Sequence, residues 1–249
     1  MTTRRALFRL TLLTLLTLLL PLAGCLEHDQ PRATAEHLAI KNRVAIVVLA
    51  DAAPRVDTIA LQPTRSTHAR ATLGGWDVRA ALQPYLAERL RGKGLTVVPL
   101  DYDPAEFAAV YASSTAYPDS QRISAALRAR AAQAQADLLV VIYRQIERDF
   151  IGESVENLVG YGLVRHEGRE PQAYAAVGLE AIAIDSGAVI ARADGLKAVP
   201  LAADAWREAY ATDDTVAIEG AGVPVVTAAL TAALQGAALG AAQEAGLSH

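Results

Sequence analysis

Short apolar runs alternate with amphipathic segments in the first half of the chain. Residues 44–49 and 138–143 consist of aliphatic and aromatic residues only, which is typical of strands buried on both faces. A shorter run at 95–100 predicts a third strand. Between these runs, residues 76–91 and 120–136 repeat apolar positions three or four residues apart and predict helices. Right-handed crossovers would make the three strands parallel.

The second half of the chain has a different pattern. Residues 173–184 and 188–199 are strand-like and are separated by Asp185-Ser186-Gly187, a turn sequence that predicts an antiparallel hairpin. An Ala- and Leu-rich helix is predicted for residues 223–243. The fold class is therefore α/β, with one mixed sheet in the order β-α-β-α-β, hairpin, carboxyl-terminal helix. Residues 51–75 are too long for a structureless loop and predict either an extra edge strand or a surface flap.

Three segments resemble known periplasmic α/β domains. They are residues 44–49, residues 135–140 at the start of a long strand, and residues 179–190 around the hairpin turn. Their order and texture resemble the CsgG-like curli-channel lipoproteins and the amino-terminal domain of TolB proteins, which implies one periplasmic domain over 43–249. Curli channels line a pore with strands that alternate apolar and polar positions. Residues 150–171 do not alternate, so we predict no pore.

The first 24 residues have the pattern of a signal peptide. Arg4, Arg5 and Arg9 precede an apolar run at 10–20, which is shorter than the roughly 17–25 residues that span a bilayer. The run is followed by Leu22-Ala23-Gly24-Cys25, which resembles the lipobox of bacterial lipoproteins. The alternative is an ordinary secretory signal whose cleavage site happens to contain a cysteine, but chance would then have to supply these four residues in order at the right distance. The chain contains no other cysteine with which Cys25 could form a disulfide or a metal site.

The lipobox resemblance implies that cleavage leaves Cys25 at the amino terminus with diacylglycerol on its thiol. Two or more acyl chains anchor a protein stably in a bilayer, whereas one binds marginally. Leu26 stands where an Asp would mark retention in the inner membrane, so the resemblance implies the outer membrane of a Gram-negative cell. Residues 25–42 are polar, contain Pro31 and lack a sustained periodicity, which predicts a tether.

Composition and charge narrow the classes of function. The chain is 52% hydrophobic and 20% charged, which suffices for a globular core. Removal of the signal peptide takes three of the 23 basic residues and leaves a formal charge of 20 − 27 = −7. A net acidic chain with dispersed arginines gives no reason to expect nucleic-acid binding. Without a second cysteine the fold has no disulfide, so packing must hold it.

No catalytic, metal-binding or cofactor-binding motif is visible. The chain lacks a Gly-x-Ser-x-Gly elbow and a phosphate-binding loop, and no pair of histidines has metal-ligand spacing. Solvated surface positions are the simplest interpretation of the histidines. Glu180 is a lone carboxylate in an apolar strand; exposure on one sheet face explains it best, and a buried acid with a raised pKa is the alternative. The histidines are His28, His37, His68, His166 and His249.

Two features suggest contacts with partners. The long connection 150–171 carries Phe150, Leu158, Tyr161 and Leu163, which form a candidate partner-binding segment; alternatively these residues cover a sheet edge or form a small strand. In the last helix, Gly236 and Gly240 are spaced for close packing. We expect this small-residue face to pack on the sheet, with a contact between protomers as the second interpretation.

Two hypotheses for function follow. The first is an outer-membrane lipoprotein that binds the bilayer through acylated Cys25 and another envelope protein or its own copies through its domain, without catalysis. The second is a membrane-tethered periplasmic hydrolase whose active site is assembled from distant parts of the chain. Glu180, His166 and Asp185 are its candidate residues.

Overall fold

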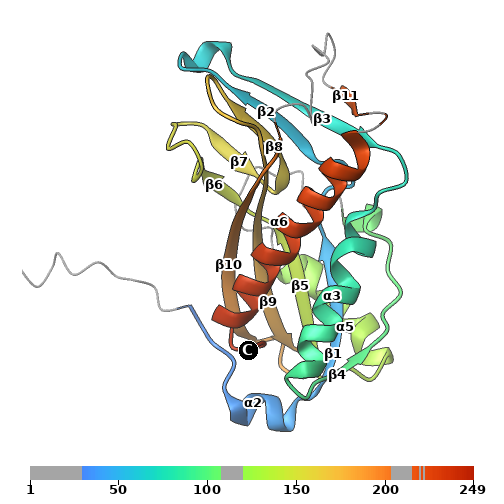
Figure 1. Ribbon diagram of the computed structural model, residues 1–249. Coiled ribbons are helices and arrows are strands. Elements are labelled where there is room, and N and C mark those ends of the chain that lie inside the picture. The colour runs from blue at the N-terminus through green and yellow to red at the C-terminus, as the bar shows by residue number, and fades with distance from the viewer. Residues whose placement is uncertain (1–29, 108–119, 203–214, 219, 221) are drawn as a thin grey trace, which may run out of the picture. The chain divides into compact units, whose positions relative to one another are not determined.

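A mixed β-sheet with helices packed on it forms the centre of the protein (Figure 1). The computed structural model describes residues 30–107, 120–202, 215–218, 220 and 222–249. The signal peptide predicted for 1–24 and the lipidation site predicted at Cys25 lie outside the described residues.

Three parallel strands form one half of the sheet, as the sequence predicts. Strand β1 (Arg43–Leu49) lies between β4 (Thr96–Val98) and β5 (Leu138–Arg144) and runs parallel to both. Alternate residues of β1 pack on opposite faces of the sheet, one toward helix α3 (Val78–Gly92) and the other toward α5 (Ser120–Gln133). Because both faces are covered, the strand has no polar residue after Arg43.

The predicted hairpin is also present. Strand β9 (Gln172–Ala183) pairs antiparallel with β10 (Val189–Pro200), and β9 pairs antiparallel with β5. The turn between β9 and β10 contains Gly187 at φ 73°, a backbone conformation that favours glycine.

Helix α6 (Gly222–Glu244) packs along β9 and β10 through a face of small residues. At Gly195 of β10 the helix comes so close that a β-carbon would lie 1.9 Å from the carbonyl oxygen of Ala237. The helix therefore packs on the sheet as predicted, but mainly through its alanines. Of the two glycines expected on the packed face, Gly236 lies next to the Lys197 side chain of β10, whereas nothing lies within 4 Å of a β-carbon added at Gly240, so the expectation is wrong for Gly240. Among the described residues, only α6 is long and apolar enough to cross a membrane; half of its most apolar stretch is buried in the domain, as in a core helix.

Two segments without a firm prediction extend the sheet. Residues 51–75 form β2 (Arg55–Ile59), the short helix η2 (Pro63–Arg65) and β3 (Thr67–Leu73), and residues 161–166 form β8. The strand order is β11-β3-β2-β8-β9-β5-β1-β4, where β11 is Thr215–Ile218. Residues 55–59 thus form an inner strand between β3 and β8, and neither a lone edge strand nor a flap.

A small hairpin leaves the sheet between β5 and β8. It consists of β6 (Ile146–Arg148) and β7 (Asn157–Val159). Three backbone hydrogen bonds mark the point of departure: Gln145 donates to Ala176, Ala176 to Gly160, and Gly160 to Gln145, at 3.0, 2.6 and 2.8 Å. Strand β9 can therefore pair with β8 through its first residues and with β5 through its last ones.

The predicted tether is shorter than expected, because the folded unit begins at Pro31 and not at residue 43. Helix α2 (Ala35–Ile40) is held by a capping box, in which Thr34 Oγ1 accepts from the His37 amide and His37 Nδ1 accepts from the Thr34 amide. Leu38 packs on the main core. Only residues 25–30 of the predicted tether precede the domain.

Candidate functional site

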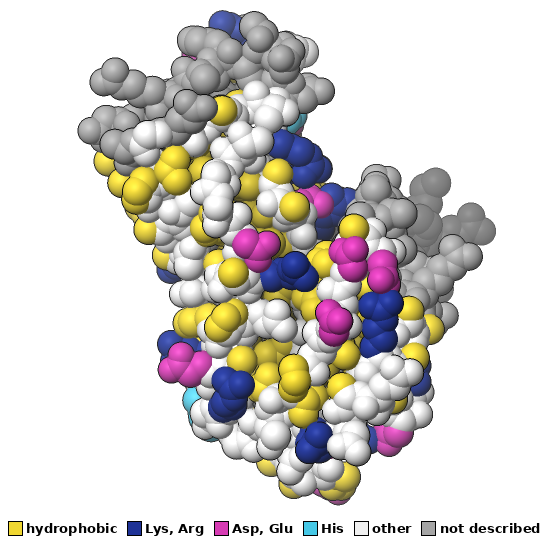
Figure 2. All heavy atoms as spheres, turned by 90° about the vertical axis from the view of Figure 1, so that its right-hand side faces the viewer, with side chains coloured by type: hydrophobic (Ala, Val, Ile, Leu, Met, Phe, Trp, Pro, Cys, Tyr) yellow, Lys and Arg dark blue, Asp and Glu magenta, His cyan; other side chains and the backbone are white. Residues whose placement is uncertain are grey.

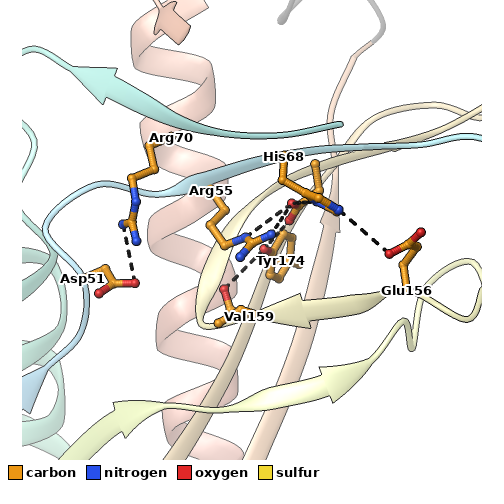
Figure 3. A network of polar contacts seen from close by, with 8 residues as sticks. Asp51, Arg55, His68, Arg70, Glu156, Val159 and Tyr174 are labelled. Carbon is orange, nitrogen blue, oxygen red and sulfur yellow. Dashed lines mark hydrogen bonds and ion pairs between the residues drawn. The ribbon is translucent and has the colours of Figure 1, made fainter. Parts of the chain in front are cut away.

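A network of charged and polar side chains surrounds the buried carboxylate of Asp57 (Figure 3). Asp57 Oδ1 lies 2.9 Å from Arg55 Nη2 and 2.7 Å from His68 Nδ1, and the Tyr174 hydroxyl donates to Oδ2 at 2.6 Å. Arg55 and Asp57 are two residues apart on β2 and so share a face, and His68 is the register partner of Asp57 on β3. Tyr174 approaches from β9.

The partners of Asp57 determine its charge. Burial alone would raise the pKa of this carboxyl, but hydrogen bonds from His68, Arg55 and Tyr174 and the charge of Arg55 outweigh burial and lower it. The hydrogen bond to Asp57 raises the pKa of His68, and burial raises the pKa of Tyr174 far above its usual range. At neutral pH the network therefore contains an ionised Asp57 and a neutral Tyr174.

A second carboxylate, Asp149, organises the loop between β6 and β7. Its oxygens accept backbone hydrogen bonds from Ile151, Gly152 and Ser154 at 3.1, 2.9 and 3.2 Å, and Oδ2 lies 2.6 Å from Nε2 of His166 on β8. Although burial raises the pKa of Asp149, these hydrogen bonds lower it to about 2. A β-carbon at Gly152 would lie 2.1 Å from His166 Nε2, so the loop is packed directly on the imidazole.

Together the two networks attach the β6–β7 hairpin to the sheet. Glu156 of the hairpin lies 3.9 Å from His68 Nε2, and Asp149 binds His166. Beneath the hairpin is a small apolar cluster that also contains the ring of Tyr174. The side chains of His68 and His166 contact carboxylates within the described residues, and these contacts hold the hairpin on the sheet. The cluster consists of Ile59, Leu158, Val164 and Tyr174.

The three candidate residues of the hydrolase hypothesis do not come together. Glu180 pairs with Arg192 on β10 at 2.5 Å, His166 with Asp149, and Asp185 with Lys41 at 2.5 Å. Glu180 is 4% exposed, so the predicted exposure on a sheet face is wrong. The strand is covered there, and the ion pair with Arg192 compensates the buried charge.

The candidate partner-binding segment is also corrected. Leu158, Tyr161 and Leu163 are buried in the hydrophobic core, and Phe150 is half-buried against the cluster beneath the hairpin. These side chains therefore do not form an exposed binding surface. The alternative interpretation, a strand in this segment, holds for Leu158 in β7 and for Tyr161 and Leu163 in β8, whereas Phe150 lies in a turn. The prediction of solvated histidines is wrong for His166, which is 7% exposed, because Asp149 provides its buried partner.

A crevice lies beyond the carboxyl end of β1, a position where open α/β sheets commonly bind ligands. Strand β4 pairs only with Arg43–Ala45, and side chains cover the rest of that edge: Gln83 donates to the Ile46 carbonyl, and the Tyr102 hydroxyl bonds the Val48 backbone. A cavity of about 360 Å³ is lined there by the end of β1, the start of α3 and residues 103–105.

The acidic groups around this cavity already have partners. Asp77 caps α3 by accepting from the Ala80 amide, Asp103 accepts from the Ala105 amide, and Asp51 pairs with Arg144 at 3.2 Å. No group of three His, Cys, Asp or Glu side chains in the described part of the chain can hold a metal ion. Figure 2 shows acidic, basic and apolar side chains interspersed on the right-hand face of Figure 1, without a large patch of one charge.

No protein-family model and no curated protein matches this chain. Several solved structures, including the following three, are similar to it at low identity. Protein XCC0632 from Xanthomonas campestris, described with the family model DUF330, has 12% identity and a TM-score of 0.41. The alignment covers 82% of this chain and 84% of XCC0632. A PelC dodecamer from Paraburkholderia phytofirmans has 14% identity and a TM-score of 0.34, covering 83% and 91%. The hypothetical protein CT253 from Chlamydia trachomatis has 16% identity and a TM-score of 0.34, covering 79% and 97%. These likenesses are too distant to transfer a function.

Proposed function

We propose that this chain is an outer-membrane lipoprotein whose periplasmic α/β domain binds another envelope protein or its own copies and carries out no catalysis. The observation that carries the proposal is the sequence Leu22-Ala23-Gly24-Cys25 directly after an apolar run. The resemblance of residues 44–49, 135–140 and 179–190 to CsgG-like and TolB domains supports an envelope role and is part of the proposal.

The start of the folded unit fits an anchored protein. Six chain steps separate Cys25 from Pro31, and an extended chain covers at most about 3.3–3.6 Å per residue, so roughly 20–22 Å. An acylated Cys25 would therefore hold the domain next to the membrane. A partner in the same membrane or in the adjacent periplasm would lie within reach.

The use of the polar side chains supports a binding role over a catalytic one. Asp57, the most buried carboxylate among the described residues, is bound by the side chains of Arg55, His68 and Tyr174. Asp149 accepts hydrogen bonds from backbone amides and contacts His166. Their hydrogen bonds stabilise the junction between sheet and hairpin. A general base must lie within reach of a substrate proton, and both of these carboxylates are buried.

Palmitate labelling in cells tests the anchor. Wild type should incorporate label and fractionate with the outer membrane, whereas Cys25→Ser should lose the label and keep its uncleaved signal peptide, because its only thiol is gone. Leu26→Ala is the matched control and should keep both label and location. Leu26→Asp should keep the label but move to the inner membrane. Labelling of Cys25→Ser would refute the proposal.

Crosslinking in intact cells followed by mass spectrometry tests the binding role. We expect crosslinks to one envelope protein or between copies of this chain, and we expect them to decrease in the unanchored Cys25→Ser protein. Recovery of the monomer alone, at the native expression level and with crosslinkers of different reach, would contradict a binding module.

A further inference from the structure

We propose that the end of the domain that carries α2 lies against the bilayer and contacts the headgroup region of the leaflet that holds the anchor. This proposal rests on the proposed lipidation of Cys25 and adds an orientation and a lipid-contact surface. The occupant of that surface is the phospholipid bilayer itself.

Pro31 is the first residue of the folded unit, and backbone hydrogen bonds hold it and Ala33 in place. The Pro31 carbonyl accepts a hydrogen bond from the Arg192 amide at 2.8 Å, near the start of β10, and the Ala33 amide donates to Ala245 at 2.9 Å, just after α6. The chain therefore enters the domain at a fixed place. Figure 1 shows α2, the carboxyl end of α6 and the turn between β9 and β10 at this same end.

The length of chain between Cys25 and Pro31 limits how far the entry point can lie from the bilayer. Pro31 can lie at most roughly 20–22 Å from Cys25. Helix α6 has 23 residues and is therefore about 35 Å long at 1.5 Å per residue. Its carboxyl end lies at the α2 end of the domain, and its amino end lies toward the opposite end. The turn between β2 and β3 lies at the opposite end (Figure 1), so the anchor brings α2 to the bilayer much more readily than that turn.

The side chains at the α2 end of the domain suit a contact with lipid headgroups. Ile40 of α2 is 72% exposed, although Leu38 of the same helix packs on the core. Lys41 follows Ile40 directly and pairs with Asp185, and the exposed Arg32 precedes Ile40 by eight residues. An apolar side chain near basic ones is typical of an interfacial contact. Acidic residues Glu36 and Asp185 nearly balance these charges, so we expect the contact to need little anionic lipid.

A fluorescent label at position 40 tests the contact. Lipidation consumes the Cys25 thiol, so Ile40→Cys provides the only free thiol of the mature protein and can be labelled with an environment-sensitive dye. Leu61→Cys is the matched control, because Leu61 is 85% exposed and lies in the turn between β2 and β3. Both labelled proteins, full-length and lipidated, are reconstituted in phosphatidylcholine vesicles and in phosphatidylethanolamine–phosphatidylglycerol vesicles.

In both vesicle types the dye at position 40 should shift to shorter wavelength, and lipid-borne quenchers should quench it at least about twofold more than the dye at position 61. Equal quenching at the two positions in floating vesicles would overturn the proposed orientation and leave the anchor intact. If neither protein floats with the vesicles, the proposed lipidation itself is wrong.

A second measurement avoids the label. Ile40→Asp should leave flotation unchanged, since the acyl chains supply the affinity, but it should reduce the protection that vesicles give to the α2 amides in hydrogen exchange. Leu61→Asp should leave that protection unchanged. Equal protection of α2 in wild type and Ile40→Asp would count against the contact.

Discussion

The hydroxyl of Tyr174 offers a sharp test of the Asp57 network. Tyr174→Phe keeps the ring in the cluster beneath the hairpin and removes only the hydrogen bond to Asp57 Oδ2. Hydrogen bonds to charged groups contribute about 1.5–3 kcal/mol when one partner is removed. Tyr174 and Asp57 are both fully buried, so water cannot replace the lost donor. For a domain of this size, the loss corresponds to a decrease in melting temperature of roughly 3–12 °C.

The pH dependence distinguishes this bond from ordinary packing. The pKa of Asp57 is lowered in the folded state, so its stabilisation is present above its unfolded pKa and is lost as pH falls through the folded pKa. Removal of the Tyr174 hydroxyl raises the folded pKa toward the ordinary value. The stability difference between wild type and Tyr174→Phe should therefore be largest near neutral pH and shrink below about pH 3.8, the ordinary value of an aspartate.

The assay is urea unfolding followed by tryptophan fluorescence between pH 3 and pH 7. Tyr161→Phe is the matched control, because the buried Tyr161 hydroxyl donates at 2.5 Å to the neutral backbone carbonyl of Asp51. Its loss should cost about 0.5–1.5 kcal/mol at every pH in this range. In a double-mutant cycle, Tyr174→Phe should cost much less when Asp57 is already Asn. Equal costs and equal pH profiles for the two Tyr→Phe variants would refute a charged hydrogen bond at Asp57.

Two further variants test the packing of α6 and the hairpin loop. Gly195→Ala places a methyl group against the Ala237 carbonyl and should destabilise the domain by about 1–3 kcal/mol or more in urea unfolding. Gly240→Ala is its control: nothing lies within 4 Å of the added carbon, so the helix should gain roughly 0.5–1 kcal/mol, and equal effects would disprove the close approach. Asp149→Ala removes the acceptor of three backbone amides and should cost at least about 1–3 kcal/mol near neutral pH. Since the folded pKa of Asp149 is about 2, the difference from wild type should shrink as pH falls from about 4 through 2, and a difference that does not change with pH in this window would contradict the assignment.

The predictions from sequence succeeded where local pattern and burial agree. Strands β1 and β5 are apolar apart from Arg43 at the start of β1 and Arg144 at the end of β5, because both of their faces are covered. The turn at Asp185-Ser186-Gly187 places a glycine where φ is positive. The inner position of strand β2 was not predicted, and a strand in this segment was only one of two alternatives. Its short sequence, Arg55-Val-Asp-Thr-Ile59, contains polar residues on the face that the hairpin covers. From the sequence alone, a charged residue that is buried in a strand cannot be distinguished from an exposed one, because its partners lie elsewhere in the chain.

The Asp57 network could not be predicted because its members meet only through strand register. Asp57 and His68 are 11 residues apart and become neighbours once β2 and β3 pair, whereas Tyr174 is 117 residues from Asp57 and reaches it across β8. A one-residue slip in either pairing would turn these side chains to the opposite face. The reverse also holds: in the correct register an ionised Asp57 is satisfied, whereas in a slipped register it would keep Arg55, its neighbour on β2, but lose His68 and Tyr174. The network therefore penalises incorrect pairing in a part of the sheet whose short strands carry little apolar area to specify register.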